Sequence, residues 1–118
     1  MTAFDYDGRT FRPDGDTGTQ ATYHQDADLV WGEFAGGHVR RGSLTGTCDQ
    51  DGVVTFAYTM VLDSGALITG RCRSTPQVLG DGRIRFTEDW ERYLPTHETG
   101  VSYLEEVPAA DGRRAAAP

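Results

Sequence analysis

Several sequence signals are scarce in this chain, and each scarcity excludes a class of protein. No apolar run approaches the ~20 residues that a transmembrane helix needs. Basic residues number 11 against 18 acidic ones, and the net charge of −7 disfavours nucleic acids and anionic membranes as partners. The start, Met-Thr-Ala-Phe-Asp, lacks a basic segment followed by an apolar one, so a cytoplasmic location is expected.

Residues typical of metal and cofactor sites are also few. The histidines His24, His38 and His97 fall on an outward strand position, a turn edge and a loop, so no metal site is predicted. The sequence has no glycine-rich phosphate loop before a helix, no GxSxG motif and no Cys/His pair on one face. We therefore expect no cofactor.

A helical period is missing too, and short alternating segments separated by glycine-containing turns take its place. This pattern predicts an all-β fold: one small antiparallel meander barrel of about eight or nine strands over residues 1–107, followed by a disordered tail, 108–118. The predicted strands are Ala3–Tyr6, Arg9–Arg12, Thr19–His24, Asp28–Ala35, His38–Asp49, Val53–Leu62, Ala66–Leu79, Arg83–Tyr93 and Gly100–Val107.

The turns predict which residues face each other. Gln50-Asp51-Gly52, Asp63-Ser64-Gly65 and Gly80-Asp81-Gly82 fit three-residue hairpin loops, and Gly36-Gly37 fits a two-residue loop. The resulting pairs are Cys48 with Val54, Leu44 with Tyr58, Tyr58 with Gly70, Phe56 with Cys72, Cys72 with Trp90, Ser74 with Glu88, Glu33 with Arg40, and Trp31 with Gly42. Most large apolar side chains then share one face, which a short chain can bury only by curling its sheet into a barrel.

The same pairing separates the two cysteines. A whole strand lies between the strands of Cys48 and Cys72, and two strand spacings of ~4.8 Å exceed the ~7 Å Cα limit of a disulfide. Two unbridged thiols are predicted.

Glycines, aromatic rings and charges all fall on the predicted inner face. Gly42, Gly46 and Gly70 remove side-chain volume in mid-strand, which either leaves a cavity or makes room for rings packed over bare backbone. Glu88 lies between Phe86 and Trp90, where desolvation would raise its pKa and suit it to acid–base chemistry. A structural hydrogen bond is the commoner role of such a carboxyl.

As a set, many short motifs resemble a family of small bacterial proteins with a calycin-like or lipocalin-like barrel, whose members often carry the label "N-acetylglutamate synthase". The motifs include Phe4–Phe11, Tyr23-His24-Gln25, Leu29-Val30-Trp31, Thr69-Gly70-Arg71-Cys72, Glu88 with Trp90, and the segment from Gly100 to Glu106. The resemblance implies a compact β-barrel. It does not imply acetyl transfer, which needs a mixed α/β domain with a pyrophosphate-binding turn. Family members carry Arg-Tyr-Gln-His where this chain has Ala57-Tyr58-Thr59-Met60, so the interior here is more apolar.

Three hypotheses follow. In the first, the barrel encloses a small apolar organic ligand and acts as a cofactor-independent isomerase or cyclase of specialised metabolism, with Glu88, Tyr58, Arg40 and Glu33 as catalytic residues. Its ligand-binding residues would be Tyr23, Trp31, Leu44, Phe56, Met60, Ile68, Cys72, Phe86 and Trp90. In the second, the same pocket serves a non-catalytic binder or carrier. In the third, the core is filled and the protein associates with others, for example as a homodimer, through its outer face.

Overall fold

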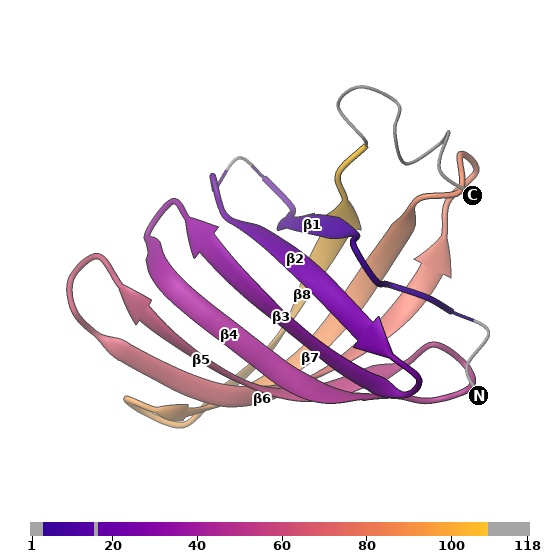
Figure 1. Cartoon of the computed structure of the whole chain (residues 1–118). Helices are drawn as coiled ribbons and strands as arrows, with labels where there is room; N and C mark the ends of the chain where they lie inside the picture. Colours follow the sequence, from indigo (N-terminus) through magenta and orange to yellow (C-terminus); the bar gives the residue numbers. More distant parts are fainter. Residues whose placement is uncertain (1–3, 16, 109–118) are drawn as a thin grey trace.

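The computed structural model describes residues 4–15 and 17–108, which form a closed barrel of antiparallel strands without a helix (Figure 1). Each strand pairs with the next one along the chain, and β1 also pairs with β8, which closes the barrel. The predicted all-β meander barrel is therefore confirmed. The strands are β1 (Thr10–Pro13), β2 (Gln20–Asp26), β3 (Leu29–Gly36), β4 (Val39–Cys48), β5 (Val54–Leu62), β6 (Leu67–Val78), β7 (Ile84–Leu94) and β8 (Glu98–Glu106).

The three-residue hairpins set the predicted registers of β4 through β7. Leu44 pairs with Tyr58, Phe56 with Cys72, and Ser74 with Glu88. At Asp63–Gly65 the Gly65 N–H donates to the Leu62 carbonyl, and Gly65 has a φ of 87°, the left-handed geometry that this turn requires. Cys48 and Cys72 are buried and are not joined in a disulfide, as the register predicts.

The ninth predicted strand, Ala3–Tyr6, is wrong over its described residues. Phe4–Tyr6 pairs with no strand; instead the backbone N–H of Tyr6 donates to the side-chain oxygen of Gln25 over 2.9 Å. The Tyr6 hydroxyl donates to the carbonyl of Gly52, in the β4–β5 turn, over 2.6 Å. This segment therefore crosses one end of the barrel and closes it. Of the predicted tail, residues 109–118 lie outside the described residues.

An aromatic cluster fills the closed end. Phe86 lies 5.0 Å from both Tyr6 and Phe11 and 6.0 Å from Tyr23, measured between ring centroids, and all four side chains are fully buried. Rings at these separations interact favourably beyond their buried area. These four rings therefore form a packed layer at the closed end of the barrel, and this layer is called the floor of the interior below.

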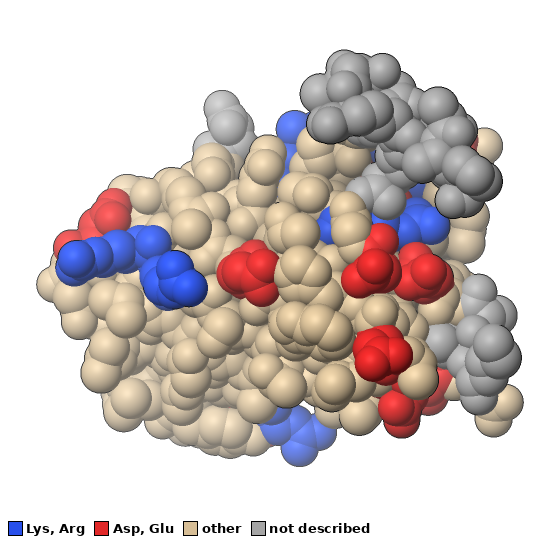
Figure 2. Space-filling view, in the orientation of Figure 1, with Lys and Arg blue, Asp and Glu red and all other residues tan. Residues whose placement is uncertain are grey.

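The outer surface carries most of the charge. Figure 2 shows acidic side chains gathered toward the end of the barrel where the β2–β3 hairpin lies, with basic side chains both directly above this group and at the opposite end of the same face. Among the described residues there is no helix that is both long and apolar enough to cross a membrane.

Candidate functional site

A cavity of about 290 Å³ lies inside the barrel, between the aromatic cluster and the end formed by the β1–β2 connection and the β3–β4, β5–β6 and β7–β8 hairpins. Its walls are mostly apolar. They consist of Pro13, Thr17, Thr19, Ala21, Tyr23, Phe34, Val39, Leu44, Phe56, Tyr58, Met60, Cys72, Glu88, Trp90, Arg92, Ser102 and Leu104. A mostly apolar pocket with a few convergent polar groups is typical of a small-molecule site.

Glu88 is the central polar group of this cavity. Ser74 Oγ donates to Glu88 Oε2 over 3.1 Å, Cys72 Sγ to the same oxygen over 3.5 Å, and Ser102 Oγ to Oε1 over 3.4 Å. Burial raises the pKa of Glu88, and the three donors offset only part of that effect. The site thus holds a carboxyl that resists ionisation, in contact with the cavity.

Two further polar atoms in the walls are buried without a hydrogen-bond partner in the described part of the chain. These are the hydroxyl of Tyr23 and Nε of Arg92. Unpaired buried donors are uncommon and costly, and at the wall of a cavity they indicate where a ligand's polar atoms would bind. Burial also raises the pKa of Tyr23, and the nearby Glu88 carboxyl adds to this, so the hydroxyl remains a donor.

Cys72 lines the cavity but is not activated. Burial raises the pKa of its thiol, and the adjacent Glu88 carboxyl raises it further. A reactive cysteine needs a lowered pKa, so this thiol serves as a small apolar wall group.

Most of the predicted site residues do come together. The residues that line the cavity are Tyr23, Leu44, Phe56, Tyr58, Met60, Cys72, Glu88 and Trp90. Phe86 is inside the barrel but belongs to the aromatic cluster below the cavity. Ile68 is buried in the core without forming part of the cavity wall.

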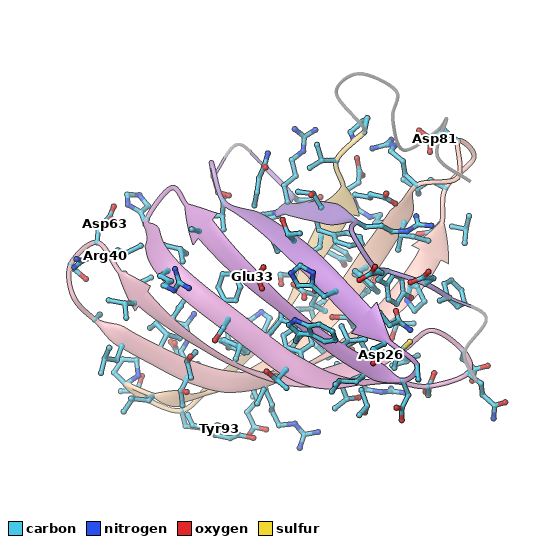
Figure 3. The ribbon with its side chains drawn as sticks, viewed as in Figure 1. Asp26, Glu33, Arg40, Asp63, Asp81 and Tyr93 are labelled. Atoms are coloured by element: carbon cyan, nitrogen blue, oxygen red, sulfur yellow. The ribbon has the colours of Figure 1, made fainter. Side chains whose placement is uncertain are left out.

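The inward placement predicted for Trp31, Glu33 and Arg40 is wrong. Trp31 is 38% exposed and stacks on His24. Glu33 Oε1 lies within hydrogen-bond distance of His24 Nε2, at 2.6 Å, on the outer face of β2 and β3 (Glu33 is labelled in Figure 3). Arg40 is exposed and lies far from Glu33, at the β3–β4 hairpin (Figure 3). None of the three contacts the cavity.

Two irregularities explain this error. The hairpin pairs Gly36 with Val39, so its loop is Gly37-His38 and not Gly36-Gly37, and a bulge then shifts the register before Phe34 pairs with Gly42. A register change by an odd number of residues reverses the facing of a whole strand. A second shift between Val39 and Arg41 leaves Arg40 as the bulged residue of β4.

The cavity residues missed from sequence have different origins. Phe34, and not Trp31 or Glu33, is the β3 side chain that lines the cavity. This is the direct result of the shifted register. Arg92 follows Trp90 by two residues and continues the inward alternation of β7, a signal that was available in the sequence. Ser102 and Leu104 lie on β8, whose facing no turn predicted.

The inward glycines make room for rings. A Cβ on Gly42 would overlap the Phe34 ring, and one on Gly100 would overlap the indole of Trp90. A Cβ on Gly70 would meet the Tyr58 hydroxyl and the Glu91 carbonyl. Of the two interpretations, close packing over bare backbone is the one that these positions support. The cavity lies next to these glycines, and the rings that pack over them form part of its wall.

The described residues contain no group of three or more His, Cys, Asp or Glu side chains arranged to hold a metal ion.

Comparison with known proteins gives one family, described as avidin-like protein, whose model matches residues 4–107. Searches of curated proteins and of solved structures found no match. Since the family model spans the whole barrel, from the segment that closes its end to the residue that follows β8, the chain belongs to the avidin-like family.

Proposed function

We propose that this protein binds a small organic molecule inside its barrel. The observation that carries the proposal is the apolar cavity of about 290 Å³ with Glu88 at its inner wall. Family membership agrees, because avidin-like barrels bind small ligands. A filled core would have left no space between Trp90, Met60 and the aromatic cluster.

The ligand is largely apolar with a polar group at its inner end. Phe56, Met60 and Trp90 offer apolar contact, while the unpaired hydroxyl of Tyr23 and the carboxyl of Glu88 offer hydrogen bonds. A carbonyl or hydroxyl oxygen on the ligand would accept the hydrogen bond that Tyr23 lacks. This removes the cost of the buried unpaired donor and so favours such a ligand over a hydrocarbon.

One observation supports a catalytic extension. A carboxyl with a raised pKa keeps its proton to a higher pH than a solvent-exposed carboxyl does, and can transfer it within a closed site. Glu88 could give its proton to one atom of a bound substrate and take a proton back from a neighbouring carbon. This would move a double bond without any net change in protons, as an isomerase or cyclase requires. Tyr58 and Tyr23 would orient the substrate by donating hydrogen bonds to one of its polar atoms.

Native mass spectrometry of the protein purified from its own host, compared with the denatured mass, tests binding. A co-purifying small molecule is expected, and its mass would identify the ligand class. A bare protein mass that no compound in an apolar metabolite library shifts would refute the proposal. Glu88→Gln then separates binder from catalyst, with Glu33→Gln on the outer face as the matched control. A catalyst loses turnover and keeps the ligand, whereas a binder changes only in affinity.

A further inference from the structure

A groove of about 370 Å³ crosses the outer face of β4, β5, β6 and β7, near the β5–β6 hairpin. The outer wall of a barrel is convex, so a hollow in it needs a local cause. Two bulges flank this groove, because register shifts leave Arg40 of β4 and Tyr93 of β7 outside the strand pairing (both are labelled in Figure 3). Bulges bend the strand that carries them and are common beside active sites. The groove is therefore built into the strand pairing.

One side of the groove is apolar. Val61 faces Leu67 across β5 and β6, and Leu94 lies on β7 opposite Thr69. The two leucines are 57% and 44% exposed, which is unusual for large aliphatic side chains that share one groove. Single exposed apolar residues are ordinary on a protein surface, whereas a contiguous group marks a surface that binds another molecule.

A row of hydroxyl groups runs along the middle of the groove. Ser43, Thr59 and Thr69 lie directly opposite one another on β4, β5 and β6. Neighbouring strands are ~4.8 Å apart, so the hydroxyls follow one another at about that interval. A hydrocarbon chain laid over them would remove their hydration and return no hydrogen bonds, whereas peptide amides can donate to them and accept from them. The groove therefore suits a peptide better than a lipid chain.

Arg41 gives the groove a positive charge. It is exposed, lines the groove beside Val61, and makes no ion pair with any residue that the structure describes. The exposed neighbour Arg40 adds a second positive charge, and together they outweigh the carboxyl of Asp63 in the adjoining β5–β6 turn. Arginine pairs strongly with carboxylates through two parallel hydrogen bonds. The charge at this end of the groove is thus complementary to an acidic side chain.

The strand spacing sets the distance between the acidic and apolar parts of such a partner. Arg41 and Leu67 lie in one row on β4 and β6, two strand spacings or ~10 Å apart. An extended chain advances ~3.3 Å per residue, so side chains two to four residues apart reach from one to the other.

We propose that this groove binds an extended peptide segment of another protein, in which an Asp or Glu lies two to four residues from an aliphatic residue. The carboxylate pairs with Arg41, the aliphatic side chain packs on Leu67 and Leu94, and the peptide amides bond to the row of hydroxyls. The site lies outside the barrel, so the inference goes beyond the proposed function and does not depend on it.

Selection of random heptapeptides from a display library against the intact protein tests this. The enriched peptides should share a carboxylate and an aliphatic residue at that spacing, and their synthetic forms should bind in solution, as measured by fluorescence anisotropy. Arg41→Glu should weaken binding about tenfold, because attraction becomes repulsion. Leu67→Ala should weaken it about threefold to tenfold through lost apolar contact. Arg73→Glu and Leu29→Ala, at exposed positions outside the groove, are the matched controls and should bind as the parent protein does.

Each outcome decides. Enriched peptides that bind both groove variants as tightly as the parent protein dock elsewhere and would overturn the inference. A library that yields no binder, or only binders without a carboxylate, would overturn it too. Sedimentation velocity examines the other occupant: a parent dimer that both groove variants dissociate would mean that a second copy covers the groove. The circular dichroism and unfolding midpoint of each variant show that it is folded. Native mass spectrometry of the interior ligand is independent of these results, so failure here leaves the proposed function standing.

Discussion

Ser74 Oγ donates a hydrogen bond to Glu88 Oε2 over 3.1 Å, between residues that face each other across β6 and β7. Ser74 is fully buried, so this bond is made away from solvent. With Cys72 and Ser102 it forms a set of donors that lets a carboxyl remain inside an apolar barrel. The hydrogen bonds compensate for burial only in part, so the pKa of Glu88 remains raised.

Replacing Glu88 with Gln should change how stability depends on pH. Burial raises the pKa of Glu88, so the folded protein retains this proton at pH values where the unfolded chain has released it. The free energy of unfolding therefore falls as pH rises from about 4.3, the ordinary carboxyl value, through the pKa of the folded state. Glu88→Gln removes this fall. Urea unfolding at pH 4 to 8 should show the variant gaining on the parent as pH rises.

The control is Asp26→Asn, which removes an exposed carboxyl at the end of β2. The difference in free energy of unfolding between this control variant and the parent protein should not rise with pH as it is expected to for Glu88→Gln. Parallel curves for Glu88→Gln and the parent protein across the whole range would show that Glu88 ionises in the folded barrel as it does in the unfolded chain.

Truncating Phe86 should be the most damaging of the simple core substitutions. The ring is fully buried and contacts Tyr6, Phe11 and Tyr23 in the cluster that closes the barrel. Phe86→Ala should lower the free energy of unfolding by about 3–5 kcal/mol. Val78→Ala, at a side chain that is 58% exposed near the end of β6, should change it by less than about 0.5 kcal/mol. A loss at Phe86 no larger than at Val78 would contradict a packed floor.

Much of the fold could be predicted from local turn chemistry. Asp63-Ser64-Gly65 and the two turns like it each force one loop length, and loop length determines the pairings along the two joined strands up to any bulge. The turns therefore predict Glu88, Cys72 and Tyr58 on the inner face, where the structure has them. The sequence predicts both ends of each of the eight strands to within two residues.

The errors occur where more than one loop fits the sequence. Gly36, Gly37 and His38 can form two different two-residue loops, and tertiary contacts select between them: Thr19 Oγ1 donates to the Gly36 carbonyl over 2.9 Å. Bulges add a residue without a distinct sequence signal. The Gly36-Gly37 loop predicted Trp31 opposite Gly42 on the inner face, whereas in the structure Phe34 pairs with Gly42 and lines the cavity.

Adding a methyl group to Gly100 should disturb the cavity wall. A Cβ at this position would overlap the indole of Trp90, which must then move toward the cavity. Gly100→Ala should cost about 1–3 kcal/mol, as overpacking does, and shift the tryptophan emission. Gly80→Ala is the matched control because a Cβ there meets nothing within 4 Å and its φ is not left-handed. Equal effects of the two substitutions would mean that Trp90 does not lie on Gly100.

The two tryptophans should report from opposite sides of the barrel wall. Trp31 is 38% exposed on the outer face, whereas Trp90 lines the cavity. The chain has 2 tryptophans, so Trp90→Phe leaves only Trp31 emission and Trp31→Phe leaves only Trp90 emission. Acrylamide should quench Trp31 more strongly, since it is open to solvent. A compound bound in the cavity should change the emission of Trp31→Phe and leave that of Trp90→Phe unaltered. The reverse pattern would place Trp31 inside, and would restore the Gly36-Gly37 turn and the opposite facing of β3.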